Sequence, residues 1–281
     1  MRRIILIFLI LICISGCVET GSVTKNYGVV IETFQTDFNS YFSGEPVQFQ
    51  IRISNQGSNN AIIENIEIVG IELGELGWNE IENTCKNLLG TVLAPNSRKN
   101  CVWEFKSPNL NKGLSVSYEP KLRLSYFYKT TTISSVVIGT SDELRRIKTT
   151  GKTIPIKTST TGGPVSINVI TTSPIKLSDS GVTFPIKIEV KNNGGGTVCE
   201  GSCNQGKWNK IKLNIKTDMK LSDCNKEEEI QLWKGQSNTI VCSLTAPSKI
   251  SGVEEKLIEV SSEYGYITEK TTSLSITRKK I

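Results

Sequence analysis

The chain has 281 residues, with 33 Lys or Arg against 27 Asp or Glu, so its net charge is +6 at pH 7. That excess is small and evenly spread, which argues against nucleic acid as a partner. Histidine is absent, which excludes a Ser-His-Asp or Cys-His catalytic site and any zinc site built on histidine. We therefore expect a protein that is not an enzyme and that uses no cofactor and no metal.

The first seventeen residues have the layout of an export signal. A short basic start, Met1-Arg2-Arg3, precedes an apolar run over residues 4–14, and Ser15-Gly16-Cys17 follows. The run is shorter than the roughly 20 apolar residues that a spanning helix needs. A basic, apolar and then small-residue order is typical of a secretory signal, so residues 1–16 are predicted to direct export.

The end of this segment, Ile14-Ser15-Gly16-Cys17, resembles the lipobox of bacterial and archaeal lipoproteins, where cleavage falls before the cysteine and its sulfur takes a lipid. The resemblance implies that Cys17 is the lipid attachment site and that the polar residues 17–26 form a tether. The alternative is an uncleaved N-terminal anchor. In either case the protein is expected to be extracytoplasmic and attached to the cell membrane.

Two later stretches alternate strictly between apolar and polar residues. Residues 46–54 end at the turn Asn55-Gln56-Gly57, and residues 182–191 end at Asn192-Asn193-Gly194. The second stretch follows the first at an offset of 137, and Tyr126-Phe127-Tyr128 matches Tyr264-Gly265-Tyr266 at an offset of 138. Alternation with period two predicts strands with one buried face, and the constant offset indicates an internal duplication.

Each copy carries short alternating segments separated by Gly, Asn, Pro and Ser turns, which is the pattern of an antiparallel β-sandwich. The predicted fold is all-β, with two tandem sandwiches at residues 27–140 and 164–278. Residues 141–163 are rich in Thr, Lys, Gly and Ser and are predicted to be an extended linker. Within it, residues 142–147 could form one helical turn at most, and residues 153–156 could add an edge strand.

An export signal followed by tandem sandwiches with a strand-Asn-x-Gly turn resembles the CARDB-type and related immunoglobulin-like modules of archaeal surface proteins, over residues 27–277. The resemblance implies immunoglobulin-like sandwiches that act in adhesion or as a scaffold of the cell envelope, with no catalytic residues to transfer. The partner at the cell surface would be a protein or a glycan. The alternative function is an accessory subunit of a membrane transport or secretion complex.

Six of the eight cysteines lie outside residues 1–17. An even number in an exported chain indicates disulfides, although four of them could instead form a tetrathiolate zinc site. The duplication places two cysteines in corresponding parts of each copy, and the remaining two are only four positions apart. The predicted bonds are Cys85–Cys101, Cys199–Cys203 and Cys224–Cys242.

The second copy has an insertion directly after its Asn-Gly turn. From Gly57 to Ile66 there are 9 positions, and from Gly194 to Ile211 there are 17, so eight residues are extra. A glycine-rich, cross-linked loop with a tryptophan is where a sandwich would place a binding site, which makes Trp208 the first candidate. The alternative is a lid over one end of the core with Trp208 tucked underneath.

The neighbours of the other three tryptophans in the sequence predict whether their side chains are exposed or buried. Trp78 is the next candidate, as an exposed aromatic platform. Trp103 alternates with Cys101 and Phe105 and is predicted to be in the core, whereas Trp233 could face either way. The tyrosine pairs at 126, 128, 264 and 266 are explained by packing of the sheet.

Overall fold

The computed structural model describes residues 27–74, 76–151, 156–248, 250 and 252–278. The predicted signal segment 1–16, the lipid site Cys17 and the rest of the tether lie outside these residues. Among the residues described, no helix is long and apolar enough to cross a membrane.

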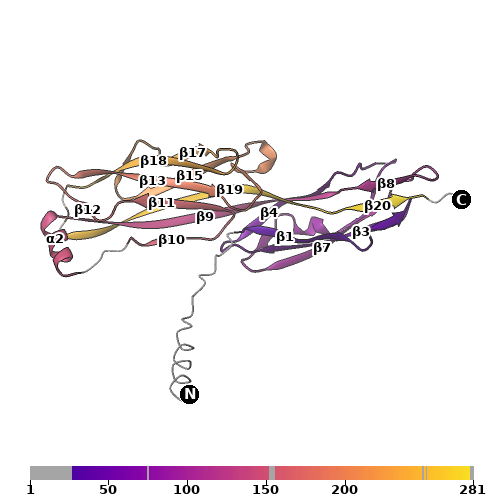
Figure 1. The fold of residues 1–281 in the computed structure, drawn as a ribbon, viewed down its shortest axis with the longest axis horizontal. Coiled ribbons are helices and arrows are strands. Elements are labelled where there is room, and N and C mark those ends of the chain that lie inside the picture. Colours follow the sequence, from indigo (N-terminus) through magenta and orange to yellow (C-terminus); the bar gives the residue numbers. More distant parts are fainter. Residues whose placement is uncertain (1–26, 75, 152–155, 249, 251, 279–281) are drawn as a thin grey trace, which may run out of the picture.

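The described chain is all-β apart from one α-helix and two short 3-10 helices (Figure 1). The first copy contains β1 (Val29–Thr36), β2 (Ser40–Phe42), β3 (Pro46–Asn55), β4 (Ala61–Val69), β5 (Asn79–Asn83), η2 (Thr84–Leu88), β6 (Val92–Leu93), β7 (Arg98–Lys106), β8 (Ser115–Tyr118) and β9 (Lys121–Gly139). Two elements follow, α2 (Ser141–Thr149) and β10 (Thr158–Thr160). The second copy contains β11 (Val165–Thr171), β12 (Ile175–Lys176), β13 (Val182–Asn192), β14 (Thr197–Cys199), η3 (Cys203–Gln205), β15 (Lys210–Thr217), β16 (Lys220–Ser222), β17 (Glu227–Gln231), β18 (Ser237–Ala246), β19 (Val253–Thr271) and β20 (Leu274–Thr277).

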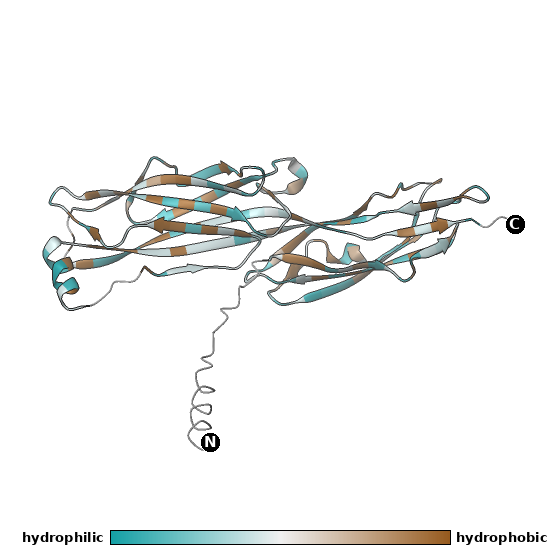
Figure 2. Ribbon diagram, viewed as in Figure 1, coloured by the Kyte–Doolittle hydropathy of each residue, from teal (hydrophilic) through white to brown (hydrophobic). Residues whose placement is uncertain are grey.

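Four sheets organise these strands. Each copy has a four-stranded sheet, β1-β3-β7-β5 in the first and β11-β13-β18-β16 in the second. A nine-stranded sheet with the path β17-β15-β19-β9-β4-β6 runs through both copies, and β2-β20-β8 form a small sheet. Hydrophobic and hydrophilic residues alternate along the strands (Figure 2), and the apolar positions predicted on β3 and β13 are buried, including Phe49 and Ile188.

The nine-stranded sheet is built on one long ladder. β9 and β19 have 19 residues each and pair antiparallel from end to end. β8 and β20 continue the pairing in the same register, with Tyr118 opposite Leu274. With this continuation the pairing runs from Ser115 opposite Thr277 to Gly139 opposite Val253, and its central pair is Phe127 and Gly265. These two residues occupy the same position of the repeat at the offset of 138. The two copies are therefore related by an internal pseudo-twofold axis at this pair.

The long strands each belong to both copies. β4 pairs with residues 121–127 of β9, whereas β10 and β12 pair with residues 132–134 and 138–139 of the same strand. β15 pairs with residues 258–261 of β19, while the end of β19 lies against the first half of β9. Each strand thus begins in the sheet of its own copy and ends in that of the other. The domain boundaries at residues 140 and 164 stay a prediction.

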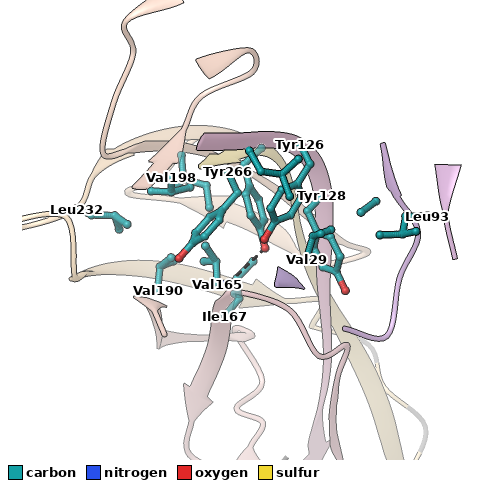
Figure 3. Packing of buried hydrophobic residues seen from close by; sticks show 14 of the residues in the cluster. Val29, Leu93, Tyr126, Tyr128, Val165, Ile167, Val190, Val198, Leu232 and Tyr266 are labelled. Carbon is teal, nitrogen blue, oxygen red and sulfur yellow. Dashed lines mark hydrogen bonds between the residues drawn. The ribbon is translucent and has the colours of Figure 1, made fainter. Parts of the chain in front are cut away.

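Four tyrosines of β9 and β19 pack together where the two copies meet, and three of them, Tyr126, Tyr128 and Tyr266, are labelled in Figure 3. Tyr126, Tyr128, Tyr264 and Tyr266 are all buried, and the ring centroids are 5.7 Å apart for Tyr126 and Tyr266 and 6.2 Å apart for Tyr128 and Tyr264. Three hydroxyls have hydrogen-bond partners in the linker or at the ends of strands of the second copy. Tyr128 donates to the Gly162 carbonyl (2.7 Å), Tyr264 accepts from the Val165 N–H (3.3 Å), and Tyr266 donates to Asn192 Oδ1 (2.7 Å).

The burial of these phenols predicts loss of stability in alkaline solution. Burial raises the pKa of Tyr266 to about 12 and the pKa values of Tyr126, Tyr128 and Tyr264 above the ordinary value. Because the unfolded phenol ionises near pH ~10 and the folded one ionises at higher pH, the stabilisation is complete below pH ~10 and is lost as the pH rises from there to the folded pKa. For Tyr266 this window ends at about 12, and within it the loss is about 1.4 kcal/mol for each pH unit. Phenolate absorbance of these four residues should appear only together with unfolding. Titration of all seven tyrosines near pH ~10 with the circular dichroism of the sheets intact would contradict the buried cluster.

The linker differs from the prediction. Residues 141–149 form the nine-residue helix α2, not a single turn, and β10 adds a short edge strand to β9. The helix has Asp142 and Glu143 in its first turn and Arg146 and Lys148 in its last, which complements the helix dipole at both ends. The possible edge strand at residues 153–156 lies almost entirely outside the described residues.

Candidate binding site

The insertion of the second copy enlarges a β-bulge of the first. β4 is continuous, but its pairing with β9 shifts between Ile63 and Asn65. In the second copy the equivalent stretch is divided into β14 and β15. The pair Cys199 and Gly265 of the second copy corresponds to the pair Ile62 and Phe127 of the first. The extra residues thus leave the sheet where the first copy has only an irregular pairing.

We call residues 200–207 the strap. Its base is closed by a bridge between Cys199 and Trp208 and by a hydrogen bond from the Glu200 N–H to the Lys207 carbonyl (3.1 Å). Cys199, directly before the strap, forms a disulfide with Cys203 within it, across a Cα–Cα distance of 5.2 Å. A disulfide across so few residues restricts the conformations that the loop can adopt.

The strap crosses the outer face of the ladder at the pseudo-twofold axis. A side chain at Gly265 would overlap with the Gly201 carbonyl oxygen and lie 3.0 Å from Cys203 Sγ, so only glycine allows this approach. The equivalent position in the first copy is Phe127. Beyond it, the Ser202 hydroxyl donates to the Glu64 carboxylate on β4. The strap therefore spans β19 and β9 and joins the second copy to the first.

Trp208 stands at the edge of a polar groove beside the strap. Its side chain is 57% exposed, and its indole N–H donates to the Cys203 carbonyl (3.1 Å), which fixes the ring. The groove has a volume of about 580 Å³ and is also lined by Lys121, Arg123 and Glu269 of the ladder. An aromatic ring held above fixed polar groups is suited to binding a partner.

The charges in this groove are already paired with one another. Arg123 donates to Glu269 (2.7 Å) and to Glu67 (3.1 Å), and Lys121 lies 3.2 Å from Glu269. Burial opposes ionisation of Glu269, but hydrogen bonds from Arg123 and Lys121 outweigh it and hold the pKa of this carboxyl below its ordinary value. The groove therefore presents ordered polar groups with little net charge.

A second groove lies against the other side of the strap. Its volume is about 630 Å³, and it is lined by Ile62, Val92, Phe127 and Gly201. Ile62 is 43% exposed and Val92 is 55% exposed, so the groove is mainly apolar. The strap thus separates a polar groove that contains Trp208 from an apolar groove at the junction of the copies.

Trp78 does not form the exposed platform that we expected. It is 1% exposed, and its ring packs against those of Phe49, Phe105 and Tyr118 at centroid distances of 6.4, 6.4 and 5.3 Å. The glycines around it suggested an open loop, but the chain turns the indole into the core of the first copy. The prediction of an exposed Trp78 is wrong.

The other two tryptophans differ in exposure. Trp103 is buried, as predicted, and its indole N–H donates to Glu80 (2.8 Å). Trp233, for which both orientations were open, is 74% exposed. It lies outside the linings of the two grooves, so it is a matched control for Trp208.

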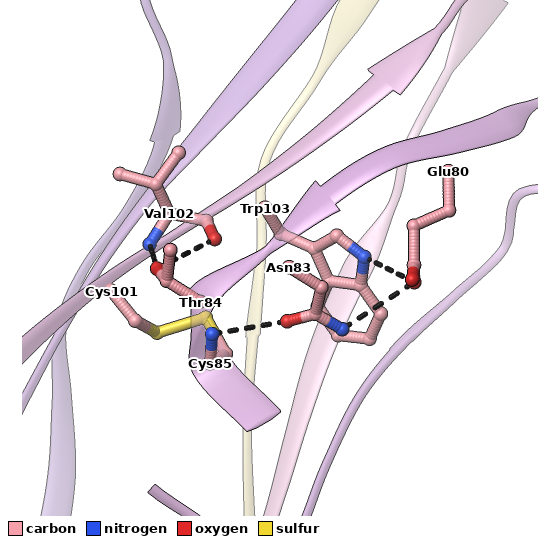
Figure 4. The surroundings of a disulfide bond; sticks show 7 residues. All are labelled: Glu80, Asn83, Thr84, Cys85, Cys101, Val102 and Trp103. Carbon is pink, nitrogen blue, oxygen red and sulfur yellow. Dashed lines mark hydrogen bonds between the residues drawn. A yellow bond between two sulfur atoms is a disulfide. The ribbon is translucent and has the colours of Figure 1, made fainter. Parts of the chain in front are cut away.

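The three disulfides join the predicted pairs. Cys85–Cys101 and Cys224–Cys242 have Cα–Cα distances of 5.0 and 5.3 Å, within the usual range for disulfides. In Figure 4, Cys85 lies two residues after Asn83, whose side chain accepts a hydrogen bond from the Cys85 N–H (3.0 Å). Because all six cysteines of the described chain are bonded in these pairs, they leave no thiolates for the alternative zinc site.

The sequence analysis missed the part of this site that comes from the first copy. Glu64, Arg123 and Phe127 lie far from the insertion in sequence, yet they contact the strap or line the grooves beside it. One signal was present. Aligning the copies at an offset of 138 places Phe127 on Gly265, and loss of a large side chain in the copy with the extra loop indicates where that loop packs.

The structure is that of a disulfide-bonded all-β protein with several antiparallel sheets. No protein-family model matches the sequence, and no curated protein matches it either. The solved structures that are similar include the secreted serine protease VesC from Vibrio cholerae, with 10% identity over 86% of this chain and 51% of that chain and a TM-score of 0.23. This chain therefore spans about half the length of VesC.

Two further structures are similar at the same low level. One is the Escherichia coli alpha-2-macroglobulin activated by porcine elastase, with 9% identity over 89% of this chain and 32% of that chain and a TM-score of 0.21. The other is the Enterococcus faecalis MSCRAMM ACE, with 9% identity over 90% of this chain and 96% of that chain and a TM-score of 0.17. At these TM-scores none of the three contributes to the functional argument.

Proposed function

We propose that this protein works outside the cytoplasmic membrane, anchored by a lipid on Cys17, as a binding or scaffold protein of the cell envelope. Three disulfides support the location, because such bonds persist in oxidising compartments. The layout of residues 1–17 supports both export and anchoring. The two copies are immunoglobulin-like modules in this proposal, and the strap with its flanking grooves is the binding surface.

The position of the strap relative to the start of the fold is the observation that carries the proposal. Gly28 lies against Tyr126 and Pro164, on the face of the ladder where the tyrosines point. The strap packs on Gly265, whose side-chain direction is opposite to that of Tyr266 because strand residues alternate. In Figure 1 the described chain starts below the long ladder, between the two copies, and the segment coloured as residues near 200 lies above the ladder at the upper edge. A tether that ends at Tyr27 would leave the strap facing away from the membrane.

The shared ladder suits such a role. Two strands of 19 residues each run through both copies, and the molecule is elongated (Figure 1). Movement of one copy relative to the other would break pairs of this ladder, so the copies act as one rigid support. The strap, itself fixed by a disulfide, would lose little entropy when it binds. The partner is a protein or a glycan of the cell surface.

Replacement of Trp208 tests this proposal. We expect Trp208→Ala to weaken partner binding by about 30-fold or more, because truncating an aromatic anchor typically costs about 2 kcal/mol. The measurement is recovery of crosslinked envelope components by the anchored protein from native membranes, with Trp233→Ala as the control for loss of an exposed tryptophan. We expect the control to recover the same components as the unaltered chain. If Trp208→Ala instead lowers the melting temperature sharply while the folded fraction still binds, the strap is a lid and not a binding surface.

A further inference from the structure

The helix α2 is only loosely held by the rest of the fold. None of its residues is buried, and its apolar residues Leu144 and Ile147 are half-buried. Leu144 packs beside Gly139 at the end of β9. A helix with an incompletely covered apolar face has room for another contact on that face.

A groove between α2 and the segment that leads into β12 has an apolar floor and a cationic rim. It has a volume of about 430 Å³, with Leu144, Ile147 and Pro174 as its apolar lining. The charged residues that line it are all basic: Arg145, Lys148 and Lys176. They come from two elements that are about 30 positions apart in sequence, so the fold itself brings the three charges together.

These three cations differ from most charged residues on the long ladder. Lys121, Lys129 and Lys256 each pair with a carboxylate at 3.2 Å or less. Within the described part of the chain, Arg145, Lys148 and Lys176 make no ion pair, and the carboxylate of Glu143 is taken up by Arg146 (2.9 Å). The groove therefore combines uncovered apolar surface with three unneutralised positive charges, which is the complement of an anionic amphiphile.

We propose that this groove is a contact site for the anionic headgroups and upper acyl chains of a lipid bilayer. The position of α2 favours a bilayer over an acidic protein. In Figure 1, α2 lies at one end of the elongated molecule and extends below the long ladder, which is the side of the ladder on which the described chain begins. This part of the argument rests on the proposed lipid anchor. A protein tethered at its middle would then touch the membrane at a second point, with the strap still facing outward.

Hydrogen exchange of the full chain in vesicles tests the proposal. The probe is a phosphatidylcholine vesicle with or without about one third phosphatidylglycerol. We expect amide exchange in residues 141–149 to slow by about tenfold or more only in the anionic vesicles, and the protection to disappear in high salt. The triple variant Arg145→Glu, Lys148→Glu, Lys176→Glu should lose the protection.

A second triple variant separates a local site from the net charge of the protein. Lys106→Glu, Lys112→Glu and Lys220→Glu change the same amount of charge at exposed positions outside the groove, and this variant should keep the protection. Equal loss in both variants would overturn the proposal. So would protection of α2 by a polyglutamate peptide without protection by anionic vesicles, since that result would identify an acidic protein partner.

The same experiment distinguishes this inference from the anchor itself. Flotation of the chain with either kind of vesicle reports the lipid anchor, whereas protection of α2 in anionic vesicles alone reports the groove. The exchange measurement is repeated on the Cys17→Ser chain with each kind of vesicle. It then reports the contact of the groove with the bilayer in a chain that has no lipid anchor. If α2 shows no dependence on phosphatidylglycerol in either chain, the groove does not bind the bilayer, whether or not the protein floats.

Discussion

Replacing Tyr264 with alanine is expected to destabilise both copies together, by about 4 kcal/mol. The side chain is 1% exposed, and its hydroxyl shares a hydrogen bond with Thr130 Oγ1 (2.8 Å) and accepts one from the Val165 N–H (3.3 Å). Truncation would leave a cavity beneath the ladder and remove partners from two buried polar groups. Because these partners belong to β9 and to the start of the second copy, neither copy should remain stable alone.

Urea unfolding measures this effect with a probe in each copy. Hydrogen exchange in β3 reports the first copy, and hydrogen exchange in β13 reports the second. Tryptophan fluorescence would mix the two, because Trp78 and Trp103 lie in the first copy and Trp208 and Trp233 in the second. Both should give one transition, shifted equally to lower urea. Leu257→Ala on the same strand is the control, because Leu257 is 57% exposed and its truncation should change the stability by less than about 0.5 kcal/mol. A first copy that keeps its midpoint in Tyr264→Ala would show that the two copies fold independently.

Replacing Cys17 with serine is expected to abolish membrane attachment of the processed protein. Serine has no thiol to take the lipid, so the chain should be released from the membrane fraction or remain uncleaved and migrate more slowly. Fractionation and the intact mass of the mature protein measure both outcomes. Cys13→Ser, four residues earlier in the predicted signal, is the matched control and should still give a lipid-modified protein.

An unchanged Cys17→Ser protein would refute the lipobox interpretation. If fractionation, migration and mass all match those of the unaltered chain apart from the substituted atom, then the cysteine carries no lipid. The uncleaved N-terminal anchor would take its place. The binding surface proposed at the strap would stand in that case, because the fold would still begin at the same face of the ladder.

The strands could be predicted from the alternation of apolar and polar residues, because the apolar residues of a strand with one buried face all lie on that face. Residues 46–54 and 182–191 alternate, and β3 and β13 bury the expected side chains. The pairing of whole strands is not local. Nothing in residues 128–139 alone indicates that their neighbour is β19 of the second copy, since alternation is equally satisfied in either sheet.

Only the inserted loop of the candidate site could be predicted, because the residues that pack against it come from distant parts of the sequence. The glycines, cysteines and tryptophan of the insertion identify an exposed loop, and Trp208 is indeed exposed. Trp78 also follows glycines, yet it is buried, because burial depends on the rings of Phe49 and Phe105 that approach from other strands. Glycine content indicates where the chain can turn, but not which way the next side chain faces.

Native-state hydrogen exchange of the long strands is the most direct test of the shared ladder. If β9 passes through both copies, amides in residues 128–139 and in residues 265–271 should exchange only by global unfolding, at the same free energy as those of β3 and β13. The cysteine bonds remain intact in this experiment, so the comparison is made on the native fold. Rapid exchange confined to residues 128–139 and 265–271, with β3 and β13 protected, would show that each copy closes on itself and that the ladder does not join them.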